Sequence, residues 1–120
     1  MNKQRLKRIN DANNKLDLLA QALGDLADDG FNAEERDKAQ TTLGDSKAAF
    51  EEALSEEQEY FDNMPEGLQG SEKGETAESN ISYLEAAIEA LERICPIDAD
   101  IELEDVTTAL SDCSEEIGNL

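Results

Sequence analysis

The sequence contains no histidine and no tryptophan, and it has only two cysteines, two prolines, two tyrosines and three phenylalanines. Without histidine there is no imidazole base, no histidine metal ligand and no Ser-His or Cys-His catalytic pair. Glycine-rich phosphate-binding motifs are also missing. No apolar run approaches the ~18 residues that a membrane span needs. We therefore predict a protein that is not an enzyme, with no cofactor, no metal and no membrane contact.

Positive charge is scarce and unevenly placed. Ten Lys and Arg stand against thirty Asp and Glu, which gives a net charge of −20 over 120 residues. Residues 1–20 hold five bases and two acids, so they carry +3 and the remaining hundred residues carry −23. So much charge of one sign repels itself and destabilises a compact state. Either function selects for a negative surface or the chain tolerates one.

The basic start is not followed by an apolar segment, as it would be in a secretory signal. We therefore expect a cytoplasmic protein, in a cell or in an infected one. In that reducing compartment Cys95 and Cys113 are expected to be free thiols in apolar positions rather than a disulfide.

Apolar residues recur every three or four positions, which predicts helices at 3–27, 32–62, 72–95 and 103–117. Asn32 is the expected N-cap of the second helix, Gly30 the expected stop of the first, and Gly44 a possible kink or break. Strand patterns are absent. We predict one all-α domain over residues 1–120, either a three- to four-helix bundle or a long antiparallel hairpin with appended helices. Asn13 lies on an apolar stripe, where a polar residue can fix the register of two paired helices. A homodimer is therefore an open alternative.

Residues 63–74 contain Pro65 and three glycines, so we predict a central turn there. Met64 and Leu68 are expected to fold back onto the core, and Ser71 or Thr76 to cap the following helix. The turn entrance carries three large apolar side chains that could contact a partner or plug the core, and we favour the plug. These are Tyr60, Phe61 and Met64.

One segment carries a resemblance. It reads Glu-Glu-Gln-Glu-Tyr-Phe-Asp-Asn-Met-Pro-Glu-Gly-Leu-Gln over residues 56–69, and Glu-Thr-Ala-Glu follows at 75–78. It resembles a group of small acidic helical proteins encoded by phages, prophages and other mobile elements. The similarity covers residues 51–94, and Asp-Asn-Met-Pro-Glu is its most characteristic string. The resemblance implies a mobile-element origin and no particular chemistry.

Two acidic segments approach the pattern of a calcium loop without meeting it. In residues 25–36, position three is Ala27 and position twelve is Arg36, where a bidentate Glu is required. In residues 98–109, Leu103 replaces the turn glycine and Ala109 stands at position twelve. We interpret both as ordinary helix entry and capping sequences.

Rows of carboxylates at helical spacing are the remaining pattern. Side chains three or four apart on a helix have Cβ atoms ~5–6 Å apart, and DNA presents one charge per ~1.7 Å of axis. An acidic row can therefore imitate a nucleic-acid backbone. Further acids line the helix at 103–117. The partner-binding candidates in the second helix, the turn and the third helix are Glu52, Glu56, Glu59, Glu66, Glu75, Glu78, Glu85, Glu89 and Glu92.

The predicted function is binding to a basic host protein such as a nuclease, a restriction enzyme, a CRISPR effector or another nucleic-acid-binding protein, with no direct nucleic-acid contact. The alternative is a homo-oligomeric helical scaffold or adaptor whose acidic surface is merely solvated. The basic residues 3–8 are expected to pair with the acidic body of the same chain or of a second copy.

Overall fold

The computed structural model describes residues 2–26, 30–95, 97 and 100–120. Within these residues there are five helices and no strand, so the all-α prediction is confirmed. The helices are α1 (Lys3–Gly24), α2 (Ala33–Asp62), α3 (Glu66–Gln69), α4 (Glu72–Glu92) and α5 (Leu103–Ile117).

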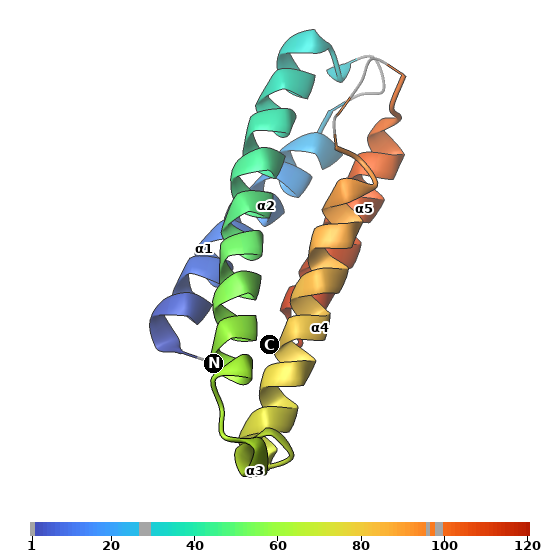
Figure 1. Cartoon of the computed structure of the whole chain (residues 1–120). Coiled ribbons are helices and arrows are strands. Elements are labelled where there is room, and N and C mark those ends of the chain that lie inside the picture. The colour runs from blue at the N-terminus through green and yellow to red at the C-terminus, as the bar shows by residue number, and fades with distance from the viewer. Residues whose placement is uncertain (1, 27–29, 96, 98–99) are drawn as a thin grey trace.

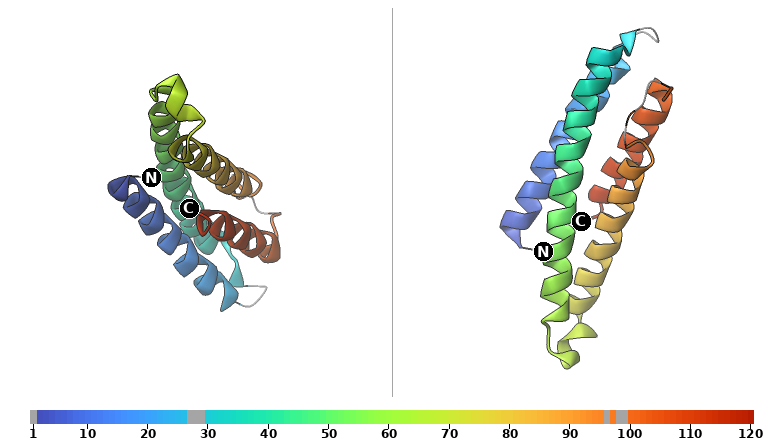
Figure 2. Two further views of the ribbon diagram at one scale, coloured as in Figure 1. Left: turned by 90° about the horizontal axis from the view of Figure 1, so that it is seen from below. Right: turned by 45° about the horizontal axis from the view of Figure 1, so that its top comes forward.

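The four long helices form an antiparallel bundle that follows chain order (Figure 1). Helix α1 packs on α2, α2 on α4, α4 on α5, and α5 packs back on α1. The view along the bundle in Figure 2 shows these four helices around a common interior, with the short α3 in the connection between α2 and α4. The bundle prediction is therefore confirmed in its four-helix form.

One hydrophobic core runs through the bundle because each long helix buries a stripe at steps of three and four residues. On α4 the stripe includes Ala77, Leu84 and Leu91, and on α5 it includes Val106 and Cys113. Each of these residues is at most 1% exposed. The predicted bounds of the last helix match α5, and its inner face buries Val106, Ala109, Leu110, Cys113 and Ile117.

Two helix boundaries show where local sequence signals succeed and fail. The Asn32 Oδ1 accepts the Glu35 N–H at 3.0 Å, so the predicted N-cap of α2 is confirmed. Helix α1 ends at Gly24 with Asp25 as its C-cap, so a stop at Gly30 is wrong. Helix α2 continues through Gly44 without the suggested break. Gly44 lies on the exposed side of α2, where its missing side chain leaves no gap in the core.

The central turn contains the short helix α3, and α4 begins at Glu72, where the third helix was predicted to begin. The Gln69 amide donates to the Phe61 and Met64 carbonyl oxygens at 3.3 and 3.4 Å, which ties α3 to the end of α2. Gly74 is buried against this turn, and a Cβ there would lie 2.7 Å from the Leu68 carbonyl oxygen. Ser71 stands at the N-cap position, but its hydroxyl donates to the Leu68 carbonyl instead of capping α4.

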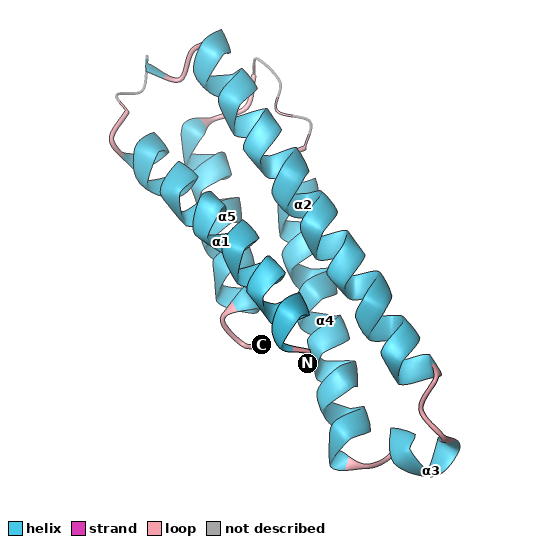
Figure 3. Ribbon diagram, turned by 90° about the vertical axis from the view of Figure 1, so that its left-hand side faces the viewer, coloured by secondary structure: helices cyan, strands magenta, loops and turns pink. Residues whose placement is uncertain are grey.

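Helices α2 and α4 reach beyond the start of α1 and the end of α5 (Figure 3). Helix α2 has 30 residues and α5 has 15, which correspond to lengths of about 45 and 22 Å. The molecule is accordingly long, at 56 × 22 × 18 Å. We call residues 57–78 the hairpin tip. Leu68 at this tip is 50% exposed, so the prediction that it folds onto the core is wrong.

Candidate protein-binding surface

The outer face of α4 carries a row of five glutamates. Their positions follow from the helical period, because the opposite face of α4 is committed to the core by Ala77, Leu84 and Leu91. All five glutamates are exposed, and the first and last are 17 residues apart, or about 26 Å along the helix. We call this set the α4 row, and it consists of Glu75, Glu78, Glu85, Glu89 and Glu92.

Most of the α4 row keeps its negative charge unneutralised. Glu92 lies 3.6 Å from the Lys47 ammonium of α2. The other four glutamates make no ion pair within 4.0 Å to any residue that the structure describes. Arg93, which follows the row, is hydrogen-bonded to the Asp112 carboxylate at 2.9 Å. The result is a negative edge whose neighbouring carboxylates are one helical turn apart, within the ~8 Å screening length of physiological salt, except between Glu78 and Glu85, which are about 10 Å apart along the helix.

Some of the glutamates predicted to form an acidic row on α2 are paired with arginines of α1. The Arg8 guanidinium lies 2.9 Å from Glu52 and 2.6 Å from Glu56. Its hydrogen bond to Glu56, together with the charges of both carboxylates, raises the pKa of Arg8 above its usual value. Glu59 and Glu66 are exposed and have no ion pair among the described residues. The basic N-terminal segment therefore pairs within its own chain, which is one of the two expected arrangements.

A buried ion pair lies below this surface and was not anticipated from the sequence. The Glu57 side chain is 1% exposed, and its Oε2 accepts a hydrogen bond from the Arg5 guanidinium at 2.6 Å. The Arg5 side chain is 12% exposed, and its Nε lies 3.7 Å from Glu56. The sequence did indicate that Glu57 is buried. Leu43, Phe50 and Glu57 are spaced seven residues apart, so Glu57 falls on the buried stripe of α2.

The aromatic residues at the tip stand apart from the core. Tyr60 is 45% exposed, and Phe61 and Met64 are half-buried. None of the three is among the residues of the described core cluster or those packed against it, and Tyr60 is too exposed to plug the core. A surface cavity of about 420 Å³ opens between α2 and α4 at this point. It is lined by Glu57, Tyr60, Glu72, Lys73, Thr76 and Ala77.

Both cysteines are free thiols, as predicted. Cys113 is buried, and burial followed by the charge of Asp17 raises its pKa to about 12. Burial also raises the pKa of the half-buried Cys95, against the opposing charge of Lys47. A thiol with a raised pKa is mostly protonated at neutral pH and is a poor nucleophile.

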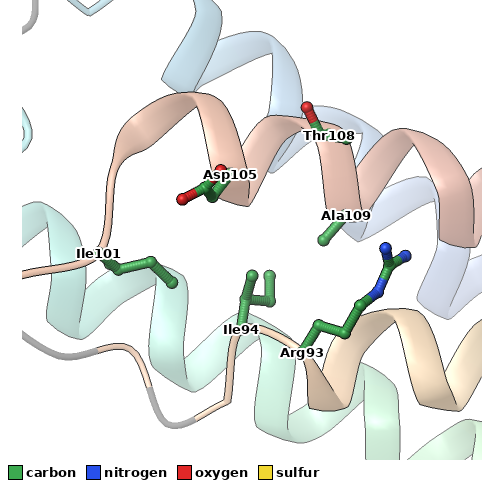
Figure 4. A pocket seen from close by; sticks show the side chains of 6 residues that line it. All are labelled: Arg93, Ile94, Ile101, Asp105, Thr108 and Ala109. Atoms are coloured by element: carbon green, nitrogen blue, oxygen red, sulfur yellow. The ribbon is translucent and has the colours of Figure 1, made fainter.

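A second cavity, of about 240 Å³, lies where α4 ends and α5 begins (Figure 4). Ile94, Ile101 and Ala109 form its apolar lining, and Arg93 and Asp105 approach it from the two helices. The Arg93 guanidinium is already engaged by Asp112. Thr108 adds a hydroxyl to the lining.

Potential metal ligands do not gather into a site in the part of the chain that the structure describes. No group of three or more Cys, Asp or Glu side chains there could hold a metal ion. Both calcium-like segments include residues outside the described ranges, at 27–29 and at 98–99.

Comparison with protein families, curated proteins and solved structures finds no match to this chain. Among the described helices, none combines the length and the apolar character required to cross a membrane.

Proposed function

We propose that this chain is a non-enzymatic acidic protein that binds a basic nucleic-acid-binding protein and competes with DNA or RNA for it. The observation that carries this proposal is the α4 row, in which four exposed glutamates have no cationic partner among the described residues. The resemblance of residues 51–94 to mobile-element proteins supports a phage or prophage origin. A host nuclease, restriction enzyme or CRISPR effector is then the expected class of target.

The geometry of the row suits a surface that normally receives phosphates. Glu75, Glu78, Glu85 and Glu89 extend over about 21 Å of one rigid helix, with neighbouring carboxylates one turn apart except at the position of Ser82. Because the helix is fixed by its buried face, the backbone positions that carry these charges are fixed before binding. A preordered row of one sign accelerates association with an opposite surface and makes binding sensitive to salt.

The contacts of the N-terminal segment bear on the scaffold alternative. A homo-oligomer joined by basic residues 3–8 would need these cations to be available to a second copy. Arg5 and Arg8 are instead engaged by Glu57, Glu56 and Glu52 of their own chain. The competition mechanism needs no such availability, and we therefore retain it as the proposal.

The test is affinity capture from a bacterial lysate with a tagged protein and a rising salt gradient. A variant with Glu75, Glu78, Glu85 and Glu89 changed to Gln removes the row. A matched control changes four exposed acids elsewhere, Glu34, Asp37, Glu104 and Glu115, to their amides, so the net charge of both variants is equal. We expect a nucleic-acid-binding protein to be captured by the wild type and the control and lost by the row variant. Equal capture by all three proteins would contradict the proposal.

A further inference from the structure

The hairpin tip carries apolar surface at Tyr60 and Leu68, whose side chains are exposed to solvent. Along most of their length α2 and α4 are packed against α1 and α5, but these two helices do not extend past the start of the tip, where Arg5 of α1 pairs with Glu57 (Figures 1 and 3). Tyr60 and Leu68 are two of the three large apolar residues with the highest exposure, at 45% and 50%. The 420 Å³ cavity beside Tyr60 falls within the ~300–1,000 Å³ range of binding pockets.

The tip is held in shape before any partner binds. The Gln69 amide is hydrogen-bonded to two carbonyl oxygens at the end of α2, and Gly74 allows the α3 backbone to lie directly on α4. A surface that is already ordered loses less conformational entropy when it binds. Exposed aromatic side chains on such a surface are typical centres of binding energy.

The charges around this apolar surface are almost all negative. Lys73 is the one base in residues 57–78, and the charge of Glu57 is paired with Arg5. The remaining acids of the tip are exposed to solvent. They are Glu59, Asp62, Glu66, Glu72, Glu75 and Glu78. An apolar surface with this rim is complementary to a segment that is apolar on one side and basic on the other.

We propose that the hairpin tip is a docking site for a basic amphipathic helix of the partner protein. This inference rests on the proposed function and specifies the element of the partner that is recognised. The partner's helix lies along the ends of α2 and α4, beyond the start of α1 and the end of α5. There it packs against α2 and α4 as an additional helix of the bundle. Its apolar side chains enter the cavity against Tyr60 and Ala77, and its Lys or Arg side chains reach the acidic rim.

The experiment uses two fluorescein-labelled synthetic peptides of about 15 residues, long enough to form a helix when bound. The first has leucine on one helical face and lysine on the other. The second has serine in place of every leucine and therefore the same charge. Binding to the full-length protein is measured by fluorescence anisotropy. The tip variant is Tyr60→Ser with Leu68→Ser. The matched control is Leu18→Ser, which removes an exposed leucine, 65% accessible, from α1.

We expect the amphipathic peptide to bind the wild type more tightly than the serine peptide. The tip variant should weaken the amphipathic peptide roughly tenfold and leave the serine peptide unchanged, and Leu18→Ser should alter neither. Equal affinity of the two peptides, or equal loss in the tip and Leu18 variants, would overturn the docking proposal. Far-UV circular dichroism of each variant verifies that the bundle is intact.

The same assay separates this inference from the function on which it rests. The four-glutamine variant of the α4 row should weaken both peptides, because it removes attraction that depends on charge alone. If it does so while the tip variant has no selective effect, the docking site is refuted and the acidic-row mechanism stands. If neither variant weakens either peptide, both proposals are contradicted.

Discussion

Removal of the Glu57 carboxylate should destabilise the bundle far more than removal of any surface glutamate. In Glu57→Ala the Arg5 guanidinium loses its 2.6 Å partner and remains largely enclosed, because the Arg5 side chain is only 12% exposed. Glu56 at 3.7 Å is the remaining carboxylate near Arg5, and Arg8 already engages it. The variant therefore leaves a desolvated cation without compensation.

Breaking a buried pair in this way costs about 4 kcal/mol. A 120-residue chain has an unfolding entropy near 0.25 kcal/mol per degree, so the melting temperature should fall by about 16 °C. A total stability of roughly 6–18 kcal/mol is expected for this length. The loss is thus a large share of the total without abolishing the fold.

The assay is thermal unfolding followed by far-UV circular dichroism, which suits a helical protein without tryptophan. Glu52→Ala is the control, because Glu52 is 67% exposed in its pair with Arg8. Replacing both buried partners, Arg5→Met with Glu57→Leu, should recover most of the loss, since no unpaired charge remains. A Glu57→Ala shift no larger than that of Glu52→Ala would refute the reasoning.

Three further changes test other parts of the structure. Gly74→Ala should lower stability by about 1–3 kcal/mol in chemical denaturation, because the new Cβ meets the carbonyl groups of Leu68 and Gln69; an unchanged midpoint would contradict that contact. Asn32→Ala should lose about 1 kcal/mol as the cap of α2 disappears, and an unchanged melting temperature would count against the cap. The pKa of Cys113 in the folded protein is about 12, above the ordinary 9.0. Because the folded state favours the protonated thiol, this group contributes its full stability below pH 9, and the contribution is lost as the pH rises toward 12. The wild type should lose stability across that window more steeply than Cys113→Ala, and equal slopes would contradict this linkage.

Helices and core could be predicted from the sequence because one physical rule governs both. Apolar residues at steps of three and four define the buried stripes, and the stripe through Val106 and Cys113 placed α5 correctly. The N-cap at Asn32 was predictable because a short polar side chain satisfies backbone N–H groups locally. The stop at Gly30 was not predicted correctly, because the chain already leaves the helix at Gly24.

The surface was harder to predict because charge alone does not reveal which carboxylates are neutralised. Glu56 and Glu89 look equivalent in the sequence, yet Glu56 is paired with Arg8 from a helix 48 residues away in sequence. Glu57 was overlooked because acids are usually exposed, although its heptad position placed it inside. The exposure of Tyr60 depends on where α1 and α5 end, and no local pattern encodes that relationship.

The central claim is that the α4 row competes with nucleic acid for a basic surface. The most direct measurement loads a bacterial lysate on immobilised duplex DNA and washes the column with this protein at low salt. The account predicts release of a DNA-binding protein by the wild type and by the matched control, and no release by the variant with Glu75, Glu78, Glu85 and Glu89 changed to Gln. Release that is unaffected by these four substitutions, or no release beyond that of an unrelated acidic protein, would contradict it.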